Sequence, residues 1–332
     1  MRVRKIPLTD IELSEWSLGC SGIGGRVQLY GINFGWPEVS DDELLAAIKA
    51  GLDLGITHFD VADLYGLGNS ERRLAWALNK LGVPSEHLVI SSKVGWMRGT
   101  AEHAYDPWHM RRQCEQSLRN LQRDYLDIYY LHHGNFGEED QWLHPAAEAL
   151  NGLQKDGLIR VKGQSAYSVA DFEKSIPVVQ PRVLQSRGNL LDTAFIDPAS
   201  SFSALLTKEQ LGFVAFSPVG AGLLTDCFDP ESPPEFKDGE SRKGNERFEA
   251  PYLRQLRPVL ESVRKRFGAS KEDLAGIAMR YVLDQPNVIS VLNGFQRRSD
   301  IISSQSVLGC ELSEEDHLWL EQAFADLRKS LC

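Results

Sequence analysis

Short apolar runs alternate with longer amphipathic stretches along most of the chain. A short apolar run is typical of a buried strand, whereas apolar positions three and four residues apart indicate a helix. The runs that we interpret as strands are residues 16–22, 57–61, 88–92, 126–131, 159–163, 183–184, 213–216 and 288–292. Because helical stretches separate these eight runs, the pattern predicts an α/β fold, a closed parallel (β/α)8 TIM barrel.

The amphipathic stretches are the predicted helices, and their first turns carry residues that helix N-termini favour. Asp41, Asp42 and Glu43 begin the first helix, where the helix dipole stabilises negative charge. Asp106-Pro107 begins the third helix in the same manner. The helices are expected over residues 41–54, 70–81, 107–121, 145–155, 168–175, 199–210, 271–284 and 298–306.

Further segments lie outside this repeat. Residues 2–14 alternate apolar and polar side chains and predict an N-terminal hairpin, whereas residues 23–36 suggest an irregular loop. Residues 226–250 are rich in proline, glycine and charge, which predicts a mobile loop of the kind that often serves as a lid. Extra C-terminal helices are expected over residues 251–267 and 313–328.

Composition and charge narrow the class of protein. The 332 residues are 42% hydrophobic and 25% charged, as in a globular protein. Barrels of this kind commonly run to about 250 residues or more as one domain. No linker divides the chain, so we expect a single domain over residues 1–332. A net charge of -10 disfavours binding to nucleic acid or anionic membranes, because both carry negative charge.

The cysteines and the lack of a long apolar segment indicate the compartment. An odd number of scattered cysteines without a close pair fits reduced thiols better than a disulfide framework. No run approaches the roughly 18 apolar residues that a membrane-spanning helix needs. We therefore expect a cytoplasmic protein. The cysteines are Cys20, Cys114, Cys227, Cys310 and Cys332.

Polar side chains stand where the apolar runs end. The carboxyl ends of the strands in a parallel barrel open on one face, so residues far apart in sequence converge there. We expect Asp60, Tyr65, Lys93 and His132 to form one cluster on that face. The polar residues at the strand ends are Asp60, Lys93, His132, Ser165, Gln185 and Ser217.

Such a cluster has a definite chemical use. A tyrosine hydroxyl, with an ordinary pKa near 10, is a weak acid, but an adjacent ammonium stabilises the phenolate and a carboxylate can hold that ammonium in place. A neutral histidine can orient a carbonyl oxygen by a hydrogen bond. No side chain supplies a hydride, so reduction of a carbonyl would need a cofactor.

Each of these residues alone also has a structural explanation. Asp60 could cap a turn and Lys93 could be a solvated strand end. His132 is followed by His133, and we expect one of the two to be only packed or solvent-facing. We expect no metal site, because adjacent histidines rarely point at one ion and no paired cysteines accompany them. Candidates for the walls of a substrate pocket are Trp36, Trp96, Trp108 and Trp142.

The motifs around these residues resemble those of the aldo-keto reductases over nearly the whole chain. Several independent motifs occur in the family's order, which makes the resemblance specific. They are residues 55–66 (GITHFDVADLYG) followed by Ser70-Glu71-Arg72, 92–95 (SKVG), 118–121 (LRNL), 124–132 (DYLDIYYLH), 155–160 (KDGLIR) and 216–225 (FSPVGAGLLT).

The resemblance implies a role for each candidate residue. Tyr65 would be the acid and base, Lys93 and Asp60 would tune and support it, and His132 would orient the carbonyl. A nicotinamide would lie against the strand-end residues, the loop after residue 217 would wrap the pyrophosphate, and the residues near 294 would meet the adenosine end. The implied cofactor-binding residues are Ser165, Gln185, Phe216, Ser217, Val219, Gly220, Gly222, Leu223, Gly294, Gln296, Arg297 and Ser304.

The chain departs from the family pattern at the cofactor. Ala166 stands where the family usually has the asparagine that contacts the nicotinamide carboxamide. Gln296 replaces a basic residue that often holds the 2′-phosphate of NADP(H), and a later basic or amide position is Asp300. Arg297 and Arg298 are close enough to substitute. By family habit NADP(H) is the preferred cofactor, with NAD(H) as the alternative.

The resemblance predicts an oxidoreductase that transfers hydride between NAD(P)H and an aldehyde, a ketone or a sugar carbonyl, as a monomer or small homo-oligomer. One alternative is an NAD-linked sugar or alcohol dehydrogenase, because residues 65–72 (YGLGNSER) resemble those of sugar-oxidising members. Another is a non-catalytic, cofactor-sensing subunit similar to the channel subunits that share this fold. The intact set of Asp60, Tyr65, Lys93 and His132 argues against it.

Overall fold

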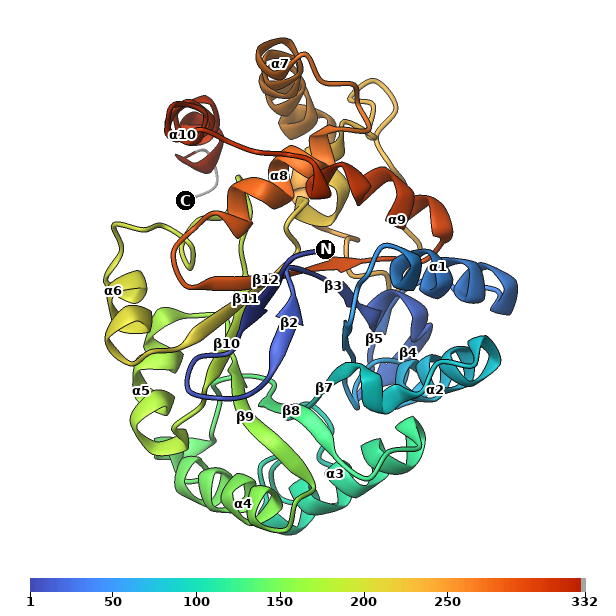
Figure 1. The fold of residues 1–332 in the computed structure, drawn as a ribbon, viewed down its shortest axis with the longest axis vertical. Helices are drawn as coiled ribbons and strands as arrows, with labels where there is room; N and C mark the ends of the chain where they lie inside the picture. The colour runs from blue at the N-terminus through green and yellow to red at the C-terminus, as the bar shows by residue number, and fades with distance from the viewer. Residues whose placement is uncertain (330–332) are drawn as a thin grey trace.

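The centre of the molecule is a closed barrel of parallel strands surrounded by helices (Figure 1). The structure is a computed structural model that describes residues 1–329; residues 330–332, Cys332 among them, lie outside the described part. Within residues 1–329, eight strands close the barrel in chain order, as the apolar pattern predicts. They are β3 (Trp16–Gly19), β6 (His58–Asp60), β7 (Val89–Val94), β8 (Leu126–Leu131), β9 (Ile159–Ser165), β10 (Val183–Arg187), β11 (Gly212–Phe216) and β12 (Val288–Gly294).

Side-chain hydrogen bonds cap the first turns of several helices. The Ser40 side chain accepts a hydrogen bond from the Glu43 amide at the start of α1, and Asp106 accepts one from the His109 amide at the start of α3. The helices are α1 (Asp41–Asp53), α2 (Asn69–Leu81), α3 (Pro107–Leu121), α4 (Leu143–Lys155), α5 (Val169–Val179), α6 (Ser201–Lys208), α7 (Ala250–Phe267), α8 (Leu274–Leu283), α9 (Arg298–Ser304) and α10 (Glu314–Lys329). Among residues 1–329, no helix combines the length and the apolar character that crossing a membrane requires.

The N-terminal hairpin closes the amino end of the barrel. Strands β1 (Val3–Lys5) and β2 (Glu12–Ser14) pair antiparallel and lie over the barrel strands at the centre of Figure 1. Ile6, Ile11 and Leu13 are buried against the apolar side chains inside the barrel. This confirms the predicted hairpin and leaves the carboxyl ends of the strands as the open face.

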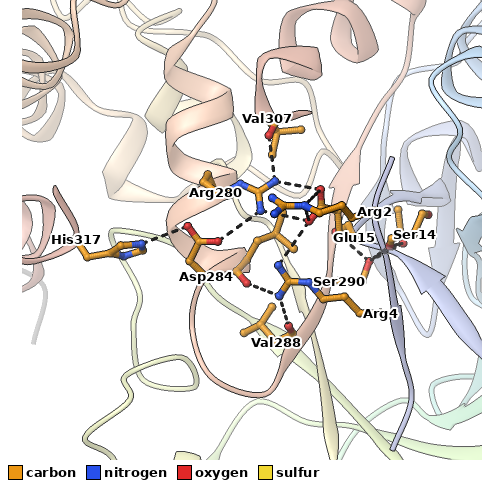
Figure 2. A network of polar contacts seen from close by, with 12 residues as sticks. Arg2, Arg4, Ser14, Glu15, Arg280, Asp284, Val288, Ser290, Val307 and His317 are labelled. Carbon is orange, nitrogen blue, oxygen red and sulfur yellow. Dashed lines mark hydrogen bonds and ion pairs between the residues drawn. The ribbon is translucent and has the colours of Figure 1, made fainter. Parts of the chain in front are cut away.

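A buried ion pair ties this hairpin to the second half of the chain. Figure 2 shows the Arg280 guanidinium of α8 pointing at the Glu15 carboxylate, which it contacts through two nitrogens at 3.2 and 3.1 Å. Arg2 and Arg4 approach the same carboxylate at 3.2 and 3.5 Å. Arg280 also donates to the Val307 carbonyl, so the network joins the first strands to the segment that follows α9.

One segment differs from the sequence-based expectation. Residues 26–35, predicted as irregular loop, form a second hairpin of β4 (Arg26–Leu29) and β5 (Ile32–Gly35). Tyr30 and Gly31 form its turn with φ of 51° and 82°, the positive values that a tight two-residue hairpin turn requires. The prediction was wrong because Tyr-Gly lacks the Asn or Asp that usually marks such a turn.

The segment predicted as a mobile loop follows a defined path to this hairpin. Between residues 226 and 250 it contains only short irregular turns and one 3-10 turn at Glu246–Phe248. The Ser241 hydroxyl donates to the Gly35 carbonyl at 3.4 Å, and the Arg242 guanidinium lies 5.2 Å from the Trp36 ring. The segment therefore bridges the two sides of the open face; its mobility stays a prediction.

Candidate active site

A large cavity opens at the carboxyl ends of the strands. Its volume is about 1210 Å³, more than the roughly 300–1,000 Å³ of a typical small-ligand pocket, so it has room for a dinucleotide and a small second molecule. It extends from the ends of β6 and β8 past β11 to the start of α9. The predicted site residues on its wall are Asp60, Tyr65, His132, Ser165, Gln185, Phe216, Ser217, Val219, Gly222, Gly294, Gln296, Arg297 and Ser304.

Lys93 connects Asp60 to Tyr65 behind the cavity wall. Its side chain is fully buried, and its ammonium donates to the Asp60 carboxylate, to the Val61 carbonyl at 2.8 Å and to the Tyr65 hydroxyl oxygen at 3.3 Å. The three donors of the ammonium are thereby all used. The Tyr65 oxygen accepts from Lys93, so its own O–H is left to donate into the cavity. The cluster expected from the strand ends is present.

Two further side chains hold the Asp60 carboxylate. Ser91 donates to Asp60 Oδ2 at 2.7 Å from the neighbouring strand β7, and Gln185 donates to the same oxygen at 3.0 Å across the barrel. His58 Nε2 lies 3.0 Å from the Ser91 hydroxyl and continues this network into the core. Sequence reasoning missed Ser91, because its side chain alternates with the apolar ones and is directed inside the barrel.

The surroundings of Tyr65 act on the pKa of its hydroxyl in both directions. Burial, and then the Asp60 charge, raise the pKa of the Tyr65 hydroxyl well above 10. The Lys93 ammonium acts in the opposite direction, because it favours the phenolate. The hydroxyl therefore stays protonated at neutral pH, which is the state that a proton donor needs.

His132 and His133 differ in their surroundings. Burial, followed by the Lys93 and His133 charges, lowers the pKa of His132 well below 6.5, so its ring is neutral. His132 Nδ1 has no hydrogen-bond partner, and its ring lies 5.8 Å from that of Tyr65 at the cavity wall. The His133 ring instead contacts the Gly95 carbonyl at 2.7 Å and the Asn135 amide. His133 is the packed residue of the two, and within residues 1–329 no group of His, Cys, Asp and Glu side chains could hold a metal ion.

Not every predicted cofactor residue reaches the cavity. Gly220 and Leu223 do not line it, and Leu223 is buried in the hydrophobic core because the turn after β11 folds its side chain inward. Ala166 is also buried away from the wall. Trp36 and Trp96 line the cavity as expected. Trp108 and Trp142 do not, since Trp108 is exposed elsewhere and Trp142 stacks on His103.

The cavity wall includes residues that the sequence did not single out. The hairpin β4–β5 contributes several apolar side chains on the side of Tyr65, and Tyr167 lies beside Phe216. Lys271, just before α8, lies on the other side, where its ammonium pairs with Asp226 at 3.1 Å. The sequence did contain a signal for Lys271. A cation at the start of a predicted helix is unfavourable with the helix dipole, which suggests that an anion lies nearby.

The chain belongs to the aldo/keto reductase family, a family of oxidoreductases that act with NAD(P)H. The family's sequence profile matches residues 29–323. The chain is 27% identical to the uncharacterized oxidoreductase YqkF of Bacillus subtilis, over 95% of this chain and 94% of that protein. It is also 27% identical to the NADH-specific methylglyoxal reductase of Escherichia coli, over 95% and 96% of the two chains.

The solved structures support the same fold. The glycerol dehydrogenase AKR11B4 from Gluconobacter oxydans superposes with a TM-score of 0.80 at 24% identity, covering 98% of this chain and 95% of that one. The (β/α)8 barrel that the sequence predicts is thereby confirmed, and the profile match confirms the family.

Proposed function

We propose that the chain reduces the carbonyl group of a small aldehyde or ketone with a nicotinamide cofactor, and that Tyr65 is the proton donor. The observation that carries this proposal is the hydrogen bond from Lys93 to the Tyr65 oxygen at 3.3 Å, in a wall where the tyrosine stays protonated. An O–H group that already accepts from an ammonium is polarised to donate.

The other groups of the cluster would act on the carbonyl oxygen or on the Tyr65 oxygen that donates to it. The nicotinamide, when bound, supplies the hydride. Tyr65 donates its proton to the carbonyl oxygen, and the Lys93 ammonium, held by Asp60 and the Val61 carbonyl, stabilises the phenolate that is left. The neutral His132 ring lies on the cavity wall beside Tyr65, where it would hydrogen-bond and orient the carbonyl.

The cavity residues fit a dinucleotide. Ser165 and Gln185 would hold the nicotinamide end, although the Gln185 amide nitrogen already donates to Asp60 and leaves chiefly its oxygen for a ligand. Phe216 would support the ring, and Ser217, Val219 and Gly222 would surround the pyrophosphate. The cations Arg242 and Lys271 lie on that part of the wall, each in an ion pair with a carboxylate, Glu240 and Asp226 respectively.

The rim near Tyr65 favours a substrate with an uncharged, apolar body. Tyr30, Ile32, Trp96 and Tyr167 line the cavity, and their exposed fractions of 57%, 68%, 42% and 44% are high for apolar side chains. Exposed apolar surface in a cavity marks a binding site. The relative that is named as a methylglyoxal reductase supports a small carbonyl compound as substrate.

The test is turnover of a panel of aldehydes and ketones with NADH and NADPH. Turnover is measured as the loss of fluorescence or absorbance of the reduced cofactor. Tyr65→Phe should lower turnover by about 10²- to 10⁴-fold while cofactor affinity stays nearly unchanged. Tyr125→Phe is the matched control, since Tyr125 lies outside the cavity against Arg123. Wild-type turnover in Tyr65→Phe would contradict the proposal; tight cofactor binding without any turnover of the wild type would favour a sensing subunit.

A further inference from the structure

A strip of buried polar side chains runs through the barrel interior from the catalytic face toward the amino end. His58, at its middle, lies two residues before Asp60 on β6 and therefore points to the same side of the strand. Around it the interior is packed with apolar side chains, so each polar group of the strip costs stability unless it has a partner. The polar strip consists of Ser290, Ser17, His58, Ser91 and Asp60.

The hydrogen bonds around His58 can have only one direction. The Asp60 carboxylate has no proton to give, so the Ser91 hydroxyl donates to Asp60 Oδ2 at 2.7 Å. Ser91 therefore accepts from His58 Nε2, 3.0 Å away, and this nitrogen must carry the hydrogen. Burial lowers the pKa of His58 to about 4, so the ring is neutral and its Nδ1 accepts from the Ser17 hydroxyl at 2.9 Å. The surroundings thus select one tautomer of His58.

The far end of the strip is anchored at the amino end of the barrel. The Ser17 hydroxyl lies 2.6 Å from the Ser290 hydroxyl, which approaches the Ser14 carbonyl at 2.8 Å. Figure 2 shows Ser14 and Ser290 beside the ion-pair network of Glu15. Ser17 and Ser290 are both fully buried, so the strip ends on the backbone and is closed to solvent at this end. It is suited to holding the His58 ring in place rather than to exchanging protons with water.

The near end of the strip acts on Tyr65 through two charged side chains. A carboxylate keeps one orientation when each of its oxygens has a directed partner. Asp60 Oδ2 accepts from Ser91 and Gln185, which leaves Oδ1 to the Lys93 ammonium. That ammonium lies 3.3 Å from the Tyr65 oxygen. If the Ser91 hydroxyl turned away, the carboxylate could rotate and draw the Lys93 ammonium away from the tyrosine.

We infer that His58 is a positioning residue for the proton transfer, an inference that rests on the proposed function. With hydrogen on Nε2, its ring donates to Ser91 and keeps the Ser91 hydroxyl directed at Asp60. With hydrogen on Nδ1, Nε2 would be an acceptor and would compete with Asp60 for that hydroxyl. The tautomer of His58, which does not line the cavity, thereby decides how firmly Lys93 is held against Tyr65.

Two amide side chains separate the roles of the ring nitrogens. Glutamine places its amide nitrogen near the position of Nε2, whereas asparagine is shorter and reaches only the position of Nδ1. His58→Gln should keep the donor to Ser91, so its kcat for a carbonyl substrate should stay within about threefold of the wild type. His58→Asn loses that donor, and its kcat should fall by about tenfold or more while KM changes by less than about twofold.

Ser91→Ala removes the hydroxyl through which His58 acts. Its kcat should fall about as far as that of His58→Asn, and the double variant should lose no more than either single variant. The matched control is Ser175→Ala, which removes a buried hydroxyl that donates to the Phe172 carbonyl in α5. It should keep the kcat of the wild type, even where urea unfolding shows an equal loss of stability.

The tautomer can be measured directly in the intact protein. The ¹⁵N chemical shift of an imidazole nitrogen depends on whether it carries hydrogen, and the signals of His58 are those that disappear in His58→Gln. We expect hydrogen on Nε2 at pH 7.5. Hydrogen on Nδ1 would overturn the inference. So would wild-type kcat in His58→Asn or Ser91→Ala, equal losses of kcat in His58→Gln and His58→Asn, or the same loss in Ser175→Ala.

Tyr65→Phe separates this inference from the proposed function. If Tyr65→Phe is inactive while His58→Asn and Ser91→Ala keep the kcat of the wild type, the positioning role fails and the reductase remains. If Tyr65→Phe turns over as the wild type does, or if the wild type reduces no carbonyl compound, the proposed function fails. The positioning role then falls with it, whichever tautomer of His58 the spectrum shows.

Discussion

Replacing Lys93 by methionine should lower the stability of the fold as well as the turnover. Methionine has a similar length but no charge, so the Asp60 carboxylate would stay buried without its cation. The side chains of Lys93 and Asp60 are 0% and 4% exposed. Removal of one partner from a buried pair typically costs about 3–5 kcal/mol, because the other charge is left uncompensated.

The hydrogen bonds that Asp60 keeps decide how large the loss of stability is within this range. Asp60 keeps its hydrogen bonds from Ser91 at 2.7 Å and from Gln185 at 3.0 Å, which satisfy one of its two oxygens. We therefore expect Lys93→Met to lower the free energy of unfolding by about 3 kcal/mol, near the lower end. Adding Asp60→Asn should recover part of this loss, since the unpaired charge then disappears.

The assay is urea unfolding at pH 7.5 of the wild type, the two single variants and the double variant. The matched control is Lys49→Met, which breaks the pair of Lys49 with Asp53, whose side chains are 62% and 61% exposed. An exposed pair of this kind contributes about 0.5 kcal/mol or less. The reasoning is refuted if Lys93→Met costs no more than Lys49→Met, or if the losses of the single variants simply add in the double variant.

Two further predictions concern a buried carboxyl and the bridging segment. Burial, and then the Glu71 charge, raise the pKa of Asp63 well above 3.8. Asp63 therefore ionises more easily in the unfolded chain, so the folded protein loses stability as the pH rises above the pKa that Asp63 has in the unfolded chain. Asp63→Asn should therefore raise Tm at pH 7.5 and change it little near pH 4; an equal shift at both pH values in calorimetry would contradict this. The Arg242 guanidinium lies 4.4 Å from the Phe236 ring and 5.2 Å from that of Trp36, so Arg242→Ala should speed nucleotide release by about two- to fivefold in stopped-flow fluorescence. An unchanged release rate would show that this contact does not retain the nucleotide.

The strands, the helices and the cluster of polar side chains at the strand ends could be predicted because they depend on local patterns and one topological rule. Apolar runs and amphipathic stretches determine element type over most of the chain. Once the strands are parallel and closed, their carboxyl ends must share a face, so Asp60, Lys93 and His132 converge whatever the details of packing. Tyr65 follows because it lies five residues after Asp60 in the same connection.

Other features depended on contacts between residues far apart in the sequence. Ser91 and Gln185 meet on one oxygen of Asp60 only because β7 is the neighbour of β6 and β10 lies across the barrel from it. The depth to which Tyr65 is buried also depends on the fold, and the loss of hydration there raises the pKa of its hydroxyl despite the neighbouring ammonium. Neither the depth of burial nor the partner of an inward-facing serine can be inferred from spacing along the chain.

The sequence by itself determined the barrel, the order of its strands and the four polar side chains that meet at its open face, because hydrophobic periodicity and strand polarity act locally. Only the tertiary structure decided what the Asp300 carboxylate contacts. In the sequence, Asp300 is one acid among two arginines. In the fold, the turn into α9 brings its carboxylate onto the amides of Gln296 and Arg297, because the first amides of a helix have no partner within the helix and an acidic side chain in its first turn can reach back to them.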